Sequence, residues 1–150
     1  MGMSTQLVRS LVVPGFYEAT EFLLSEFRQY YCRESVLYRW MCARAVEVIF
    51  DRRYISCYLD ILNIDDYLVD IAPIIRMLGR MKNVEAKKLI LKLLLRDGLP
   101  YGVIYACFTA LKYYNDIETI NYIEPYLCHK ELDIRKQAEK TLNSIRAKHK

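Results

Sequence analysis

Glycine and proline are scarce in this chain of 150 residues, which contains five and four of them. A flexible linker or a low-complexity segment rich in these residues is therefore excluded. Alternation of apolar and polar residues with period two never lasts beyond four residues, so the sequence predicts no β-strand. The most apolar run, 89–95, contains Lys92 and is too short for a transmembrane helix.

Residues and motifs that commonly act in catalysis or bind metals are also scarce. The histidines are His129 and His149, and the sequence has neither a glycine-rich phosphate loop nor a Gly-x-Ser-x-Gly motif. The five cysteines are odd in number, no two have metal-site spacing, and the N-terminal residues lack the apolar core of a signal peptide. We therefore expect reduced thiols in a cytoplasmic protein that is not an enzyme, with no cofactor and no membrane partner.

The composition and length of the chain predict one globular domain over 1–150. Apolar residues make up 53% of the chain and charged residues 27%, a balance that favours a folded protein. This length is sufficient to bury a hydrophobic core. The net charge of +4 permits an anionic partner but does not require one. Thirteen tyrosines suit half-buried positions and binding surfaces, because each ring is apolar and each hydroxyl polar.

Apolar residues at helical spacing predict a short helix over about 4–13 and then four helix pairs. The pairs cover about 16–50, 54–82, 84–115 and 117–148. We expect Phe22 and Leu127 to lie on buried faces. We expect Pro125 to kink its helix, and Pro73 to kink its helix unless that helix begins later in the sequence. Gly98 is expected to end the first helix of the third pair, and Pro100 to occupy the first turn of the second.

The second helices of the four pairs share a pattern with a period of 31 to 33 residues. The first aligned column is Cys42, Ile74, Cys107 and Ala138. The next column is Val46, Leu78, Leu111 and Leu142, and the third is Ile49, Met81, Tyr114 and Ile145. A fixed period of this size is typical of a solenoid, in which each pair buries its apolar face against its neighbours.

The stretch ELDIRKQAEKTLNSI resembles the second helix of a HEAT repeat, through Asp133, Arg135, Ala138 and Leu142. Arg39 repeats the arginine in the first copy, but Leu37 replaces the aspartate, and the middle copies have Ile71 and Ile104 at the arginine position. The period is closest to the short HEAT-like repeats first named from phycobilin lyases. This resemblance implies an all-α, right-handed superhelix whose second helices line a concave, partner-binding side. It also implies no continuous Asp–Arg ladder here.

One face of the second helices is mixed basic and aromatic, and we predict that it binds a protein or peptide partner. Its residues are Trp40, Arg44, Arg76, Tyr105, Lys112, Lys136 and Lys140. Glu47, Asp51 and Asp116 are expected to interrupt it. Four helices packed roughly 8–10 Å apart span about 30 Å, enough for a peptide or for nucleic-acid phosphates with stacked bases. The alternatives are a nucleic-acid binder and a plain solvated helix face.

Other sites have weaker support in the sequence. Cys128 and His129 lack a second pair of metal ligands, and the group Asp60, Asp65, Asp66 and Asp70 lacks the spacing of a calcium loop. Asp65 or Asp66 is expected to cap a helix, and Asp60 and Asp70 to face solvent. Trp40, Arg44 and Asp51 are similar to the residue types used by HEAT-like DNA glycosylases, and a lyase activity is a further alternative. The oligomeric state and the partner's identity are not determined by the sequence.

Overall fold

The computed structural model describes residues 5–29, 36–64, 68 and 70–149, and every regular element in these ranges is helical. The prediction of an all-α fold is confirmed. The α-helices are α1 (Thr5–Ser10), α2 (Thr20–Gln29), α3 (Val36–Ile49), α4 (Ile55–Leu62), α5 (Ala72–Met81), α6 (Val84–Leu94), α7 (Tyr101–Tyr114), α8 (Ile120–Ile123) and α9 (Leu132–Ala147). Short 3₁₀ helices are η1 (Tyr17–Ala19), η3 (Arg52–Tyr54), η5 (Ile117–Thr119) and η6 (Glu124–Cys128).

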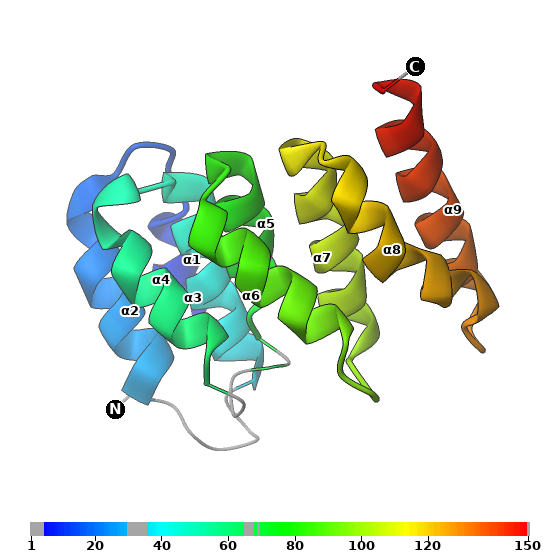
Figure 1. The fold of residues 1–150 in the computed structure, drawn as a ribbon. Coiled ribbons are helices and arrows are strands. Elements are labelled where there is room, and N and C mark those ends of the chain that lie inside the picture. Colours follow the sequence, from blue (N-terminus) through cyan, green and yellow to red (C-terminus); the bar gives the residue numbers. More distant parts are fainter. Residues whose placement is uncertain (1–4, 30–35, 65–67, 69, 150) are drawn as a thin grey trace.

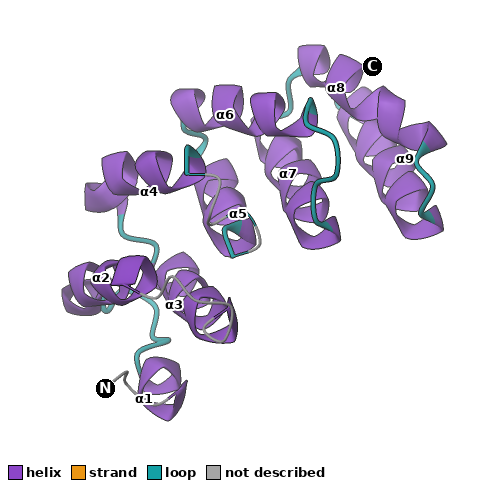
Figure 2. Ribbon diagram, turned by 90° about the horizontal axis from the view of Figure 1, so that it is seen from below, coloured by secondary structure: helices purple, strands orange, loops and turns teal. Residues whose placement is uncertain are grey.

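The helices lie in two layers. Figure 2 shows α2, α4, α6 and α8 in one layer and α3, α5, α7 and α9 in the other, with both layers following an arc and the second layer on its inner side. Helix α3 packs against α5, α5 against α7 and α7 against α9, while α1 packs against α3. In Figure 1 these inner helices run in the same direction, and the two chain ends lie at opposite ends of the molecule. Equivalent residues of successive inner helices therefore lie side by side.

The core follows the aligned apolar columns. Every member of the first two columns is at most 1% exposed, and Ile49, Met81 and Ile145 of the third are also buried. Tyr114 is partly buried and packs against this core. Burial of apolar surface is the main force that favours folding, so these columns account for the side-by-side packing of the inner helices.

Capping residues explain where the middle helices begin and end. Lys82 ends α5 in the left-handed conformation, with φ of 53°. The side chain of the next residue, Asn83, accepts a hydrogen bond from the Ala86 backbone N–H at 2.8 Å and so caps the start of α6. Asn115 ends α7 in the same left-handed conformation, and Asp116 then caps η5. Asn115 is a residue type that tolerates the left-handed conformation. The side chains of Asn83 and Asp116 provide acceptors for backbone N–H groups at helix starts that would otherwise lack partners.

Proline positions differ from expectation in part. Helix α5 begins later than the predicted helix, and Pro73 lies in its first turn, where the missing N–H has no helical partner to lose. The expected kink therefore does not apply, and the alternative of a later helix start is confirmed. At Pro125 the chain changes from α-helix to 3₁₀ helix, as a disrupted helix requires. Pro100 is the N-cap residue of α7 and so lies just before its first turn. Helix α6 ends at Leu94, so Gly98, with φ of 70°, lies in the turn and does not end the helix.

Several other local predictions are wrong. The first helix ends at Ser10, so it is shorter than predicted, and its predicted first residue, Ser4, lies outside the described residues. Phe22 and Leu127 are 40% and 39% exposed, although both were expected on buried faces. In the last pair Tyr126 takes the packing position instead, and its ring meets Phe108 edge-on at 5.2 Å. The predicted caps at Asp65 and Asp66 also lie outside the described ranges.

Two tyrosines, Tyr114 and Tyr126, join neighbouring helix pairs through hydrogen bonds of their hydroxyl groups. Tyr114 donates to the backbone oxygens of Asn83 at 2.7 Å and Leu78 at 3.3 Å, beside the end of α5. Tyr126 donates to the oxygen of Leu94, the last residue of α6, at 2.8 Å. Burial raises the pKa of Tyr126 to about 12, which keeps its hydroxyl protonated. Each ring thus packs on the core while its hydroxyl satisfies a carbonyl at a helix end.

Replacing Tyr114 by phenylalanine should lower the free energy of unfolding by about 1–2 kcal/mol, because a partly buried carbonyl loses its donor. Urea denaturation followed by circular dichroism measures this change. The adjacent Tyr113 is 42% exposed, so Tyr113→Phe is a matched control and should stay within about 0.5 kcal/mol of the native protein. Equal stability of the two variants would contradict the role assigned to the Tyr114 hydroxyl.

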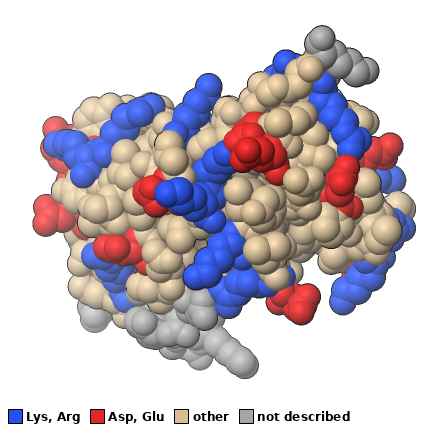
Figure 3. Space-filling model, in the orientation of Figure 1, with Lys and Arg blue, Asp and Glu red and all other residues tan. Residues whose placement is uncertain are grey.

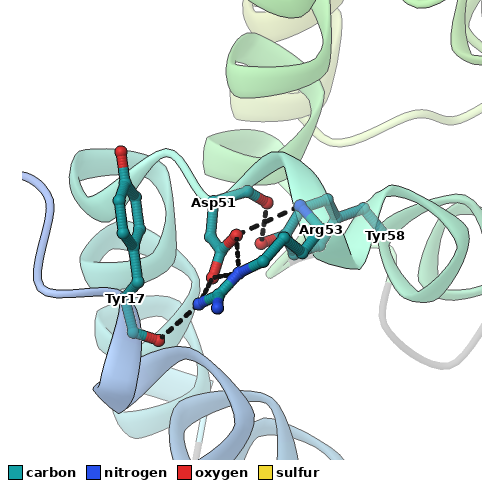
Figure 4. Close-up of polar contacts among 4 residues, drawn as sticks. All are labelled: Tyr17, Asp51, Arg53 and Tyr58. Carbon is teal, nitrogen blue, oxygen red and sulfur yellow. Dashed lines mark hydrogen bonds and ion pairs between the residues drawn. The ribbon is translucent and has the colours of Figure 1, made fainter.

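The turn after α3 is held by Asp51 (Figure 4). Its carboxylate accepts from the Arg53 guanidinium at 2.7 and 2.9 Å and from the Arg53 backbone N–H at 3.1 Å. The Asp51 backbone oxygen accepts from the Tyr58 hydroxyl of α4 at 2.9 Å. The hydrogen bond from Arg53 lowers the pKa of Asp51 below its ordinary value, and burial opposes this only partly. The carboxylate therefore stabilises the turn above its ordinary pKa, and this stabilisation is lost as the pH falls through the lowered value.

An ion pair between Arg39 of α3 and Asp70, just before α5, is buried. The guanidinium Nε lies 2.6 Å from Asp70 Oδ2, and the two side chains are 6% and 0% exposed. Asp70 was expected to face solvent, and that prediction is wrong. Burial raises the pKa of Asp70, and the hydrogen bond and charge of Arg39 offset part of this effect. The pair ties the first helix pair to the second.

Candidate partner-binding surface

The inner helices expose one narrow face each, on the side away from the outer layer. The exposed or half-exposed residues there are Leu37, Trp40 and Arg44 on α3, Arg76 and Arg80 on α5, Tyr101, Tyr105 and Lys112 on α7, and Lys136 and Lys140 on α9. We call this set the inner surface. All the residues predicted as partner-binding belong to it. Leu37, Arg80 and Tyr101 were not predicted, although helical spacing from Trp40, Arg76 and Tyr105 pointed to them.

Glu47 of α3 organises the basic part of the inner surface. Its carboxylate accepts from Arg76 Nε at 3.0 Å and Arg76 Nη2 at 2.9 Å, and from Arg44 Nη1 at 2.7 Å. The Glu47 side chain is only 5% exposed, whereas Arg44 remains 45% exposed. Glu47 was expected to interrupt the basic stripe with open negative charge. It instead lies beneath the arginines, joins α3 to α5 and fixes both guanidinium groups in place.

The other two carboxylates expected on this surface are engaged elsewhere. Asp51 is 2% exposed and holds Arg53, as described above. Asp116 forms an ion pair with Lys87 of the outer helix α6 and caps η5. The end of α3 is basic instead, because the guanidinium groups of Arg80 and Arg52 lie 4.6 and 5.5 Å from the centre of the Phe50 ring.

The aromatic part of the inner surface lies on α3 and α7. Trp40 and Tyr105 are 40% and 42% exposed. Tyr101 stacks on Tyr105, with ring centres 6.3 Å apart and an angle of 25° between the rings. Beside this stack, a shallow depression between α7 and α9 is lined by Ile104, Phe108, Ile134 and Gln137. Rigid aromatic rings of this kind expose a large apolar area while losing little conformational entropy on binding.

Lys112 and Lys140 lie near each other on neighbouring inner helices. Partial burial lowers the pKa of Lys112, and the positive charge of Lys140 lowers it further. No ion pair of either lysine with a carboxylate is present among the residues that the structure describes. Lys136, one turn before Lys140 on α9, is exposed as well. These cations leave a local excess of positive charge on the inner surface.

A larger groove lies at the base of the third and fourth pairs. It encloses about 760 Å³ between the 94–101 turn, η6 and the start of α9. His129 lines it, stacks on Tyr126 with ring centres 6.0 Å apart and accepts a hydrogen bond from the Glu131 N–H through Nδ1. The charged lining residues carry both signs, including Arg96, Asp97 and Lys130, so the groove has no clear preference for one sign of charge.

The weaker candidate sites gain no geometric support. Within the described ranges, no three His, Cys, Asp or Glu side chains gather as metal ligands would. Burial raises the pKa of Cys42 to about 12 and that of Cys107 still further, which disfavours a nucleophilic thiolate. A glycosylase-like Asp51 would need to act as a base, but Arg53 engages this carboxylate and holds its pKa low.

Comparison of the chain with protein-family models, with curated proteins and with solved structures gave no match. The HEAT-like resemblance therefore stays a prediction from the repeat pattern. In the described part of the chain, no helix has the length and apolar character needed to cross a membrane.

Proposed function

We propose that this chain is a small solenoid of four HEAT-like helix pairs that acts as a non-enzymatic protein-interaction module. The partner would lie along the inner surface, across α3, α5, α7 and α9. The observation that carries the proposal is the alignment, on one continuous face, of exposed aromatic rings with arginines fixed by Glu47. The period of the apolar columns and the two-layer packing support the HEAT-like part of the proposal.

The composition of this face is that of a binding surface. Trp, Tyr and Arg are the residue types that most often dominate binding energy at protein interfaces. Trp40 and Tyr105 offer apolar area, and Arg44 and Arg76 offer charged donors. Because Glu47 already holds both arginines, less side-chain entropy is lost when a partner binds. A merely solvated helix face would not require arginines positioned in this way.

Replacing Trp40 by alanine should reduce the amount of specifically captured partner about tenfold or more, as expected for a central aromatic anchor. The full chain is immobilised, and proteins retained from a cell extract are quantified by mass spectrometry. Phe22→Ala is the matched control, since Phe22 is also 40% exposed but lies on the outer helix α2. Melting temperatures of both variants establish that each is folded.

A partner counts as bound by the inner surface only if Trp40→Ala releases it and Phe22→Ala retains it. Arg76→Ala should weaken binding of the same partner. This substitution also removes a hydrogen-bond partner of Glu47, so the stability of the variant is measured in parallel. If every captured protein remains at native level with Trp40→Ala and Arg76→Ala, the proposed function is wrong.

A further inference from the structure

Basic residues outnumber acidic residues on the inner surface and close to it. Six basic residues belong to this surface, and two acidic residues lie beside them. The basic residues are Arg44, Arg76, Arg80, Lys112, Lys136 and Lys140, and the acidic ones are the covered Glu47 and the exposed Asp133. Figure 3 shows the opposite face, where Lys and Arg are interspersed with Asp and Glu.

Apolar and basic residues are separated along two of the inner helices, α3 and α7. In α3 and α7 the exposed apolar residues come first, namely Leu37 and Trp40, and then Tyr101 and Tyr105. In α3 and α7 the cations Arg44 and Lys112 come later along the helix than the apolar residues. In the repeat alignment, Lys140 of α9 takes the position of Arg44 and Arg76, whereas Lys136 takes the position of Trp40 and Tyr105. A segment lying across α3 and α7 would therefore meet apolar groups along one edge and cations along the other, and it would meet Lys136 and Lys140 on α9.

Lys112 and Lys140 are cations of the inner surface for which the described residues provide no ion-pair partner. The two ammonium groups repel each other, and the described residues supply neither with a carboxylate in an ion pair. The arginines beside them differ, because Arg44 and Arg76 already share Glu47. A carboxylate placed between the two lysines would relieve their repulsion and form two charge-assisted hydrogen bonds.

Building on the proposed interaction function, we propose that the partner is an acidic amphipathic peptide segment. Its Asp or Glu carboxylates would contact Lys112, Lys140 and Arg80, and its apolar side chains would contact Trp40 and the Tyr101–Tyr105 stack. Four packed helices span about 30 Å, which corresponds to about 10 residues of extended chain. Electrostatic complementarity would set the orientation of the segment and speed its association, while the aromatic contacts would supply most of the affinity.

The test uses a fluorescein-labelled peptide of about 12 residues, in which glutamates alternate with leucine and tryptophan, and its counterpart with every glutamate replaced by glutamine. Fluorescence anisotropy measures binding to the full chain at low and at high salt. We expect the glutamate peptide to bind more tightly, with an affinity that falls as salt rises. The double variant Lys112→Ala with Lys140→Ala should weaken its binding at least about fivefold.

The matched control is Lys88→Ala with Lys92→Ala. These lysines are exposed on the outer helix α6, so this double variant removes the same charge from the opposite layer. It should change the affinity less than about twofold. Equal weakening by the two double variants, or equal binding of the glutamine peptide, would overturn the acidic-segment proposal. Tighter binding of a single-stranded oligonucleotide through Lys112 and Lys140 would also overturn it, in favour of nucleic acid.

This experiment separates the two proposals. If the glutamate peptide gives no selective binding while Trp40→Ala still releases a captured protein, the inner surface binds a partner of different chemistry. Only the acidic-segment proposal then fails. If Trp40→Ala releases nothing from the extract and the peptides bind independently of Trp40, the interaction function of this surface fails as well.

Discussion

Replacing Arg39 by alanine is expected to lower the free energy of unfolding by about 3–5 kcal/mol, because the Asp70 carboxylate is left buried without its partner. This is a large fraction of the roughly 5–15 kcal/mol by which a domain is stable, so the variant should unfold at much lower urea concentration. Equilibrium denaturation at neutral pH measures the change. A loss below about 1 kcal/mol would show that solvent reaches Asp70 and that the pair is not buried in solution.

The same variant should show a characteristic pH dependence. Burial already raises the pKa of Asp70 above its ordinary value, and removing Arg39 removes the hydrogen bond and charge that oppose this rise. A carboxyl with a raised pKa in the folded state opposes folding above its ordinary pKa, and this penalty disappears as the group is protonated. The deficit of Arg39→Ala relative to the native chain should therefore shrink as the pH is lowered from neutral towards the ordinary pKa of Asp70.

A double variant provides the control for the ion pair. Replacing Arg39 by methionine and Asp70 by leucine together removes both charges, so neither is left unpaired in the core. This double variant should recover most of the stability lost in Arg39→Ala. If it is as unstable as the single variant, the effect comes from lost packing of the arginine side chain and not from the unpaired carboxylate.

Replacing Gly79 by alanine is the second large effect that we expect, a loss of about 2–4 kcal/mol. A Cβ atom at this position would lie 2.5 Å from both Cα and Cβ of Ala110, across the contact between α5 and α7. Alanine is the better helix former by about 1 kcal/mol, so intrinsic propensity alone predicts the opposite sign. Because the clash involves backbone, it is relieved only if the two helices move apart.

Two further variants isolate this clash. Gly102 lies in the first turn of α7, and a Cβ there has no atom within 4 Å, so Gly102→Ala should be neutral or stabilise by up to about 1 kcal/mol. Combining Gly79→Ala with Ala110→Gly removes the Cβ contact but leaves the Ala110 Cα 2.5 Å away, so it should restore only a small part of the loss. The urea concentration at the midpoint of unfolding, measured for the three variants, tests whether this clash exists. A stabilising effect of Gly79→Ala would contradict the close approach of α5 and α7.

Much of the architecture could be read from the sequence because it depends on local periodicity. Apolar residues at helical spacing in four copies identify both the helices and the faces that they bury, and these columns are buried in the structure. The predictions of buried side chains failed where two apolar residues of one helix fit the helical spacing equally well. Phe22 and Leu127 satisfy the spacing as well as their buried neighbours do, so only the position of the adjacent helix decides which residue is covered.

The candidate surface could be predicted only in outline. Trp40, Arg44, Arg76 and Tyr105 were placed by helical spacing, but the role of Glu47 depends on how closely α3 approaches α5. The same holds for Asp70, whose partner Arg39 lies 31 residues away in the chain. Sequence spacing carries no information about such pairs, because they form between helices and their geometry depends on the distance between helix axes.

By itself, the sequence determined the helical class, the repeat period and the apolar columns, since each follows from residue spacing within a helix. Only the tertiary structure decided which charges are paired and which are left exposed. Glu47, Asp51 and Asp70 resemble surface carboxylates in the sequence, and packing buries all three. Packing also decided which cations have partners, because Glu47 lies beneath Arg44 and Arg76, whereas the described residues give Lys112 and Lys140 no ion pair.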